Sequence, residues 1–273
     1  MGGDWLRIRV AQKLAEDLLA EWGWDSLPVD PFSIAAKHDI VIEPKPSPEP
    51  GSSGFLMRVG DVFGIMYANH VNNDGYRRFT VAHELGHYFL PGHPDKLFPH
   101  GDGLHQSRSG FVSRDPTEID ADYFAASLLM PTGLFRAAMR SAGEGLPAIE
   151  ALASLCRTSL TATAIRYAQK WDDAVAVIVS EGDRVSYCFL SEDFRALVGR
   201  EWLAPGTLLP RDTRTYHFNC DPANVRESRR AEDGTTLWHW FGKGRMELNE
   251  DVVGLGTYGR TLTMLFPDSG QED

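Results

Sequence analysis

The chain has 273 residues, enough for one large domain or two modest ones, and its 42% hydrophobic and 24% charged residues are typical of a globular protein. Its formal net charge of −11 argues against a general phosphate-binding surface and favours a basic partner. No apolar run approaches the roughly 20 residues of a membrane span. For this reason we expect no membrane anchor. Three scattered cysteines without Cys-x-x-Cys spacing predict reduced thiols, and thus a cytoplasmic protein.

The start of the chain predicts two helices and a strand. Residues 5–22 carry apolar side chains at spacings of three and four, which is typical of an amphipathic helix. Residues 28–38 predict a short second helix with Asp30 as its N-cap, leading into a strand over 39–43. Residues 44–54 hold four prolines and predict a linker or flap.

Residues 54–59 and 62–68 are separated by a Gly-Asp turn and give the clearest hairpin signal of the chain. The next stretch, residues 78–87, reads Arg-Phe-Thr-Val-Ala-His-Glu-Leu-Gly-His and combines a helix signal with metal-ligand spacing. Residues four apart lie on one helix face, so His83 and His87 can bind one ion.

Glu84 lies about 100° around the helix from His83, where its carboxylate can take a proton from a metal-bound water. This is the His-Glu-x-x-His arrangement of the zincins. In a zincin, a strand beside the cleft pairs with extended substrate. We propose residues 62–68 as that edge, with an ordinary sheet strand as the alternative.

A catalytic zinc site needs a third protein ligand and one open position. Residues 118–131 predict a second helix with Thr117 as its N-cap, and Glu118 and Asp122 share one face of it. We interpret Glu118 as the third ligand and Asp122 as the carboxylate that orients a ligating imidazole. Asp120 points elsewhere and is the weaker candidate.

His93 is a rival third ligand, because it follows His83 by ten residues, as in the metzincin pattern. The glycine of that pattern is replaced by Leu90. Residues 91–116 predict a loop over the cleft or a disordered segment. The side chain that polarises the scissile carbonyl remains open among His93, His100, His105, Tyr67, Tyr88 and Tyr123.

The blocks Arg-Phe-Thr-x-Ala-His-Glu-Leu-Gly-His and Glu-x-x-Ala-x-x-Phe-Ala-x-x-Leu-Leu-Met-Pro resemble the ImmA/IrrE family of zinc metallopeptidases. The resemblance covers residues 1 to about 140. It implies zinc ligation by His83, His87 and Glu118, with Glu84 as the general base. It also implies cleavage of a helix-turn-helix repressor or antitoxin, which switches on stress-response or mobile-element genes.

Residues 146–156 and 159–171 predict two further helices with the spacing of a helix-turn-helix, which the resemblance also favours. The second helix offers only Arg166, Gln169 and Lys170 to DNA, so we expect a structural or substrate-docking role rather than direct DNA binding. Beyond them, strands are predicted over 174–180, 184–190, 235–241, 251–258 and 260–266.

The expected fold is therefore α+β in three parts: a zincin-like metallopeptidase domain over 1–140, a helix-turn-helix-like segment over 141–171, and a C-terminal α+β domain over 172–273. The resemblance implies that this last domain is a GAF-like sensor. The expected function is that of a zinc-dependent endopeptidase. Two alternatives stay open: a DNA-binding regulator with a structural zinc, and a ligand sensor whose peptidase site is idle.

Overall fold

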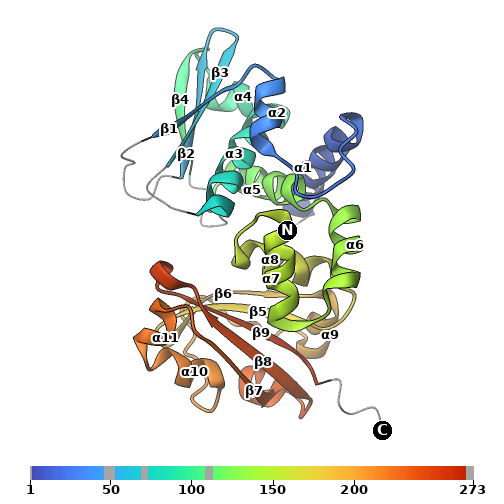
Figure 1. Cartoon of the computed structure of the whole chain (residues 1–273), viewed down its shortest axis with the longest axis vertical. Helices are drawn as coiled ribbons and strands as arrows, with labels where there is room; N and C mark the ends of the chain where they lie inside the picture. Colours follow the sequence, from blue (N-terminus) through green and yellow to red (C-terminus); the bar gives the residue numbers. More distant parts are fainter. Residues whose placement is uncertain (1, 46–52, 69–72, 108–112, 269–273) are drawn as a thin grey trace. The chain divides into compact units, whose positions relative to one another are not determined.

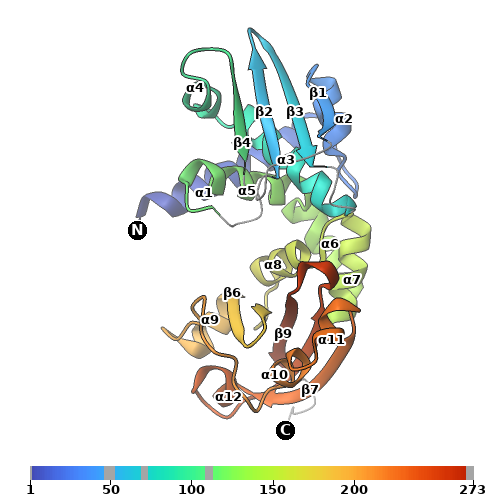
Figure 2. The same ribbon diagram turned by 90° about the vertical axis from the view of Figure 1, so that its left-hand side faces the viewer.

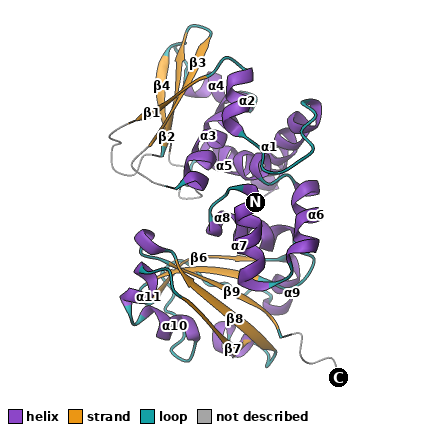
Figure 3. Ribbon diagram, viewed as in Figure 1, coloured by secondary structure: helices purple, strands orange, loops and turns teal. Residues whose placement is uncertain are grey.

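The structure is a computed structural model that describes residues 2–45, 53–68, 73–107 and 113–268. It contains helices and two sheets, which confirms the α+β class (Figure 3). The predicted flap over 44–54 lies mostly outside the described residues. No described helix is long and apolar enough to cross a bilayer.

The chain divides into two compact units. The first comprises Met1–Ala138 with Leu152–Ala162, and the second comprises Met139–Ala151 with Thr163–Asp273. The boundary therefore passes through three consecutive helices, α6 (Thr132–Ala142), α7 (Gly145–Cys156) and α8 (Leu160–Lys170). α7 and α8 match the predicted pair, whereas α6 was not predicted. The predicted division at residues 140 and 171 stays a prediction.

The first unit contains a four-stranded sheet in the order β1-β3-β2-β4. Its strands are β1 (Val41–Lys45), β2 (Gly54–Val59), β3 (Val62–Ala68) and β4 (Gly103–Ser107). β2 and β3 form the predicted hairpin, and β1 pairs with β3 in parallel. The prediction that 62–68 is a sheet edge is wrong, because β3 is hydrogen-bonded to β1 on one side and to β2 on the other.

Helices lie on one side of this sheet (Figure 1). They are α1 (Gly2–Glu21), α2 (Pro31–Lys37), α3 (Asp74–Phe89), α4 (His93–Leu97) and α5 (Pro116–Leu129). α3 lies against β2 and β3, and α5 packs between α3 and α1 (Figures 1 and 2). The expected loop over 91–116 is wrong in part, since it contains α4 and the edge strand β4.

N-caps fix where two of these helices begin. Asp30 accepts a hydrogen bond from the backbone N–H of Phe32, which confirms it as the cap of α2. The predicted cap of α5 is wrong, because Asp115 and not Thr117 accepts the first hydrogen bond, from the Thr117 N–H at 2.7 Å. Pro116 then occupies the first helical turn, where its missing N–H costs nothing.

The second unit contains an antiparallel five-stranded sheet in the order β6-β5-β9-β8-β7. The strands are β5 (Ala176–Glu181), β6 (Arg184–Leu190), β7 (Arg230–Thr236), β8 (Glu247–Gly254) and β9 (Thr261–Pro267). β5 and β6 form the predicted hairpin. The short helices are α9 (Glu192–Val198), α10 (Arg214–Asn219), α11 (Pro222–Arg226), α12 (Leu237–Phe241) and a 3-10 turn at Gly256–Tyr258.

Two strand predictions in this unit fail at their ends. The predicted strand over 235–241 is wrong, because Thr236 accepts a hydrogen bond from the N–H of His239 and starts α12. The predicted strand over 251–258 begins earlier and stops at Gly254, before the 3-10 turn. In both places local hydrogen bonds, to a side chain at Thr236 and within the backbone at the 3-10 turn, replace the extended conformation that the apolar pattern indicated.

Candidate metal centre

α3 carries the histidine pair. The helix begins after Asn73, whose side chain accepts a hydrogen bond from the N–H of Tyr76 at 3.0 Å. One turn separates His83 from His87, and both side chains are fully buried with their Nε2 atoms 3.0 Å apart. The two imidazoles therefore point at a common position on one face of the helix.

α5 brings Glu118 to the same position. A Cβ atom on Gly86 would lie only 3.1 Å from the Cα of Ala121, so the glycine allows α5 to approach α3 closely. Oε1 of Glu118 lies 3.1 Å from Nε2 of His87, and Oε2 lies 3.5 Å from Nε2 of His83. Side chains from two helices thus converge within the first unit.

Among the described residues, His83, His87 and Glu118 form the group that can hold a metal ion, with ligand atoms within 4.8 Å of one another. Burial lowers the pKa of His87 to about 3, which keeps its imidazole neutral as a ligand must be. Burial alone would raise the pKa of Glu118, but hydrogen bonds with His105, His83 and His87 lower it well below its usual range. Two imidazoles and a carboxylate are the protein ligands of a catalytic zinc site with one open position.

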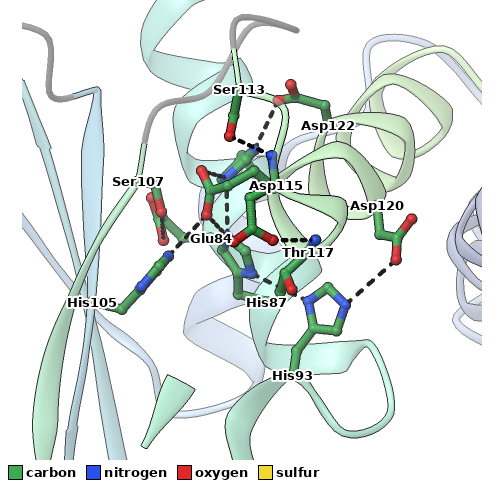
Figure 4. A network of polar contacts seen from close by, with 12 residues as sticks. Glu84, His87, His93, His105, Ser107, Ser113, Asp115, Thr117, Asp120 and Asp122 are labelled. Carbon is green, nitrogen blue, oxygen red and sulfur yellow. Dashed lines mark hydrogen bonds and ion pairs between the residues drawn. The ribbon is translucent and has the colours of Figure 1, made fainter. Parts of the chain in front are cut away.

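Both imidazoles are also held through their other nitrogen atoms. Nδ1 of His83 lies 2.9 Å from Oδ1 of Asp122, and Nδ1 of His87 lies 3.2 Å from Nδ1 of His93 (Figure 4). Burial lowers the pKa of His83, but hydrogen bonds with Asp122 and Glu118 outweigh it and raise that pKa to about 10. With Nδ1 engaged on each ring, Nε2 is the atom that each imidazole offers to a cation, which on binding would displace the Nε2 proton of His83.

The two weaker sequence candidates lie outside the metal-binding group. His93, the rival third ligand, contacts His87 from the side away from Nε2. Asp120 accepts a hydrogen bond from Arg7 at 2.7 Å, and its other oxygen lies 3.9 Å from Nε2 of His93 (Figure 4). His93 supports His87 from behind, and neither His93 nor Asp120 contributes an atom to the converging group.

Glu84 lies beside this group and is fully buried. Its Oε2 accepts a hydrogen bond from the Ser107 hydroxyl at 3.1 Å, whereas no described group hydrogen-bonds its buried Oε1. Burial raises the pKa of Glu84 to about 7. A buried carboxylate oxygen without a partner is costly, and a water held by a cation at the neighbouring ligands would satisfy it. The residues present therefore fit a hydrolytic metal site.

Gly54 leaves the space that Glu84 occupies. It faces Ser107 across the β2–β4 ladder. A Cβ atom at this position would lie 2.7 Å from Oε1 of Glu84 and 2.5 Å from Cγ2 of Thr80. Only a residue without a side chain fits here, so Gly54 and Ser107 together shape the pocket of the carboxylate.

β4 contributes residues that the sequence did not single out as a pair. Nε2 of His105 lies 2.9 Å from Oε1 of Glu118, and Ser107 contacts Glu84 (Figure 4). Residues two apart on a strand share one face, so the spacing of His105 and Ser107 was the available signal. Gly54 gave no signal, because its role depends on the approach of α3.

Residues 35–167 match a peptidase family described as the IrrE N-terminal-like domain. This range contains β4, α3 and α5, and with them every residue of the metal-binding group. Residues 35–167 belong to the ImmA/IrrE family of metallopeptidases.

A Mycobacterium tuberculosis transcriptional regulator has a similar fold, with a TM-score of 0.58 and 14% sequence identity. The match covers 94% of this chain and 76% of the regulator. At this identity the similarity shows the fold alone. A comparison with curated proteins gives no significant match.

Proposed function

We propose that the chain is a zinc-dependent endopeptidase. The observation that carries this proposal is the buried Oε1 of Glu84, without a described partner, beside the converging side chains of His83, His87 and Glu118. Three ligands and an adjacent base are the parts that metal-assisted peptide hydrolysis requires.

His83, His87 and Glu118 would hold the ion, and Asp122 would fix the tautomer of His83. Bound there, zinc would supply an acidified water and Lewis-acid polarisation of the scissile carbonyl. Glu84 takes the proton of the attacking water on Oε1 and passes it to the leaving amine. The Ser107 hydroxyl holds Oε2, which keeps Oε1 directed at the water.

For the substrate we propose a helix-turn-helix transcriptional repressor or an antitoxin, whose cleavage switches on stress-response or mobile-element genes. Two observations support this class. The match of residues 35–167 to the ImmA/IrrE family brings such regulators into consideration. The net charge of −11 also favours encounter with a basic protein, and DNA-binding repressors are basic.

Co-expression with the repressor encoded by the adjacent gene, followed by mass spectrometry of the products, tests this proposal. We expect one defined cut that requires zinc and disappears in Glu84→Gln. This substrate class would be rejected if the repressor stays intact with zinc present while the same zinc-loaded chain cleaves an unrelated unfolded protein. Cleavage of neither protein would argue against the endopeptidase.

Direct DNA binding has less support. Arg166 is one of the three predicted base or phosphate readers of the recognition helix, yet only 1% of it is exposed. Gln169 and Lys170 are half-buried at the end of α8. Base readout needs side chains that reach into a groove, so α8 offers little for recognition.

A second candidate function is ligand binding by the second unit. This unit has a cavity of about 590 Å³, a size typical of small-molecule sites. Tyr167 and Trp171 stack beside it with ring centroids 4.8 Å apart. Its lining includes Glu144, Asp173 and Asp193 and no Lys or Arg, which favours an apolar ligand with a positive charge. Calorimetry with 4-phenylbutylamine and 4-phenylbutyrate tests this candidate function. We expect the positively charged amine to bind more tightly than the carboxylate. Equal binding of the two compounds, or binding of neither, contradicts it.

A further inference from the structure

His105 enters the metal centre from the sheet and not from a helix. β4 pairs antiparallel with β2, and this register places His105 opposite Leu56, which is fully buried. Cross-strand partners project to the same face of a sheet. His105 therefore points to the face that α3 covers, where Nε2 reaches within 2.9 Å of Oε1 of Glu118 (Figure 4).

Its exposure distinguishes His105 from the other histidines around the centre. The side chains of His83 and His87 are 0% exposed, whereas that of His105 is 21% exposed. A substrate must reach the open position of the centre from solvent. His105 is thus the histidine of this cluster that lies both at the ligands and on the accessible side.

Three other candidates for the carbonyl-polarising group are engaged elsewhere. Nδ1 of His93 faces the far side of His87. The ring of Tyr88 packs 5.0 Å from Phe63 and 4.9 Å from Phe89, centroid to centroid. Tyr67 of β3 packs edge-on against the Phe32 ring of α2.

The contact with Glu118 also fixes where the proton of His105 lies. A carboxylate that ligates a metal ion is ionised, so Glu118 carries a negative charge in the loaded centre. An ionised carboxylate only accepts hydrogen bonds, so His105 must donate from Nε2. His105 is outside the group of converging ligand atoms, and an N–H donor has no lone pair on that atom for a metal.

We propose that His105 is the electrophilic donor of the peptidase. In the transition state, the hydrogen bond that its Nε2–H donates shifts from Glu118 to the scissile carbonyl oxygen. This inference rests on the proposed function. When water attacks the carbonyl carbon, the electron pair of the C=O double bond moves onto oxygen, and Glu84 takes the proton of the water. His105 keeps its proton and stabilises the new negative charge by hydrogen bonding.

The affinity of the cobalt-loaded chain for a carbonyl ligand separates this role from mere support of Glu118. In the full-length chain loaded with saturating Co²⁺, acetohydroxamate is titrated and visible absorption is recorded. The hydroxamate carbonyl oxygen stands in for the scissile carbonyl. We expect His105→Phe to bind acetohydroxamate roughly 10- to 100-fold more weakly than wild type, the loss of one hydrogen bond to a charged group. His105→Gln, which restores an N–H donor, should recover part of that loss.

His100→Phe is the matched control, since it makes the same substitution at an exposed histidine outside the metal-binding group. It should bind both Co²⁺ and acetohydroxamate as wild type does. A loaded His105→Phe variant that binds hydroxamate as wild type does overturns the proposal, whether or not its Co²⁺ affinity falls. Wild-type protein that binds neither cobalt nor hydroxamate overturns the metal centre itself, and His105's role with it.

Discussion

The Ser107 hydroxyl donates a hydrogen bond to Oε2 of Glu84 at 3.1 Å and leaves Oε1 as the oxygen without a hydrogen-bond partner among the described residues. Ser107 of the sheet thus determines which carboxylate oxygen of Glu84 can accept a proton. The metal centre is consequently built from both layers of the first unit. The helices supply ligands and base, and β4 orients them.

Ser107→Ala should reduce kcat severalfold while zinc content and KM stay close to wild type. The change leaves Oε2 of Glu84 buried without its donor, which costs about 1–3 kcal/mol of unfolding free energy. Steady-state kinetics and urea unfolding measure the two effects. Ser53→Ala removes a hydroxyl that bonds the backbone oxygen of Ser107 and should keep kcat. Equal losses of kcat in both variants would point to general damage of the sheet.

Glu84→Gln should retain one zinc per chain and lower kcat by roughly 10²- to 10⁴-fold, the contribution of a general base. The amide cannot accept the proton of the attacking water, yet it keeps the shape of the side chain. Metal analysis by emission spectroscopy and a cleavage assay check the two parts. A variant with wild-type turnover would remove Glu84 from the mechanism.

Glu118→Ala should lose zinc affinity by more than the roughly 10- to 100-fold typical of changes around a metal ligand. It removes the carboxylate that lies 3.1 Å from Nε2 of His87. Asp120→Asn, on the same helix but outside the metal-binding group, should bind zinc as wild type does. Competition with a chelator measures both affinities. Unchanged binding by Glu118→Ala would transfer the third-ligand role to another side chain.

Gly54→Ala should lower activity and destabilise the first unit by about 1–3 kcal/mol, as overpacking of a buried site does. The added methyl group would meet Oε1 of Glu84 at 2.7 Å and Cγ2 of Thr80 at 2.5 Å. Gly64→Ala on the neighbouring strand is the control, because its nearest new contact is the flexible end of Met57 at 3.4 Å. Thermal unfolding and turnover are compared in the two variants. A fully active Gly54→Ala would show that Glu84 can act from a shifted position.

The parts of the centre that are close in sequence could be predicted, because helix geometry is local. The spacing of His83 and His87 specifies one face of α3, and the pair Glu118 and Asp122 does the same for α5. The structure brings these four side chains together as the sequence indicated. The chemical role of each side chain stays a prediction, which the Glu84 and Glu118 variants test.

The parts that depend on strand order could not be predicted. Nothing within 62–68 shows that β1 will pair along it and remove it from the edge. The alignment of β4 with β2, which aims His105 and Ser107 at the centre, is likewise set by pairing between distant segments. Thr236 illustrates a different limit, since a single capping hydrogen bond turned an apolar run from strand into helix.

Anomalous diffraction at the zinc edge from crystals of the zinc-loaded chain tests the metal centre most directly. We expect one peak roughly 2.0–2.2 Å from Nε2 of His83, Nε2 of His87 and one carboxylate oxygen of Glu118. A zinc-loaded crystal with its peak elsewhere, or with the Glu118 carboxylate turned away from the two imidazoles, would contradict the proposed enzyme.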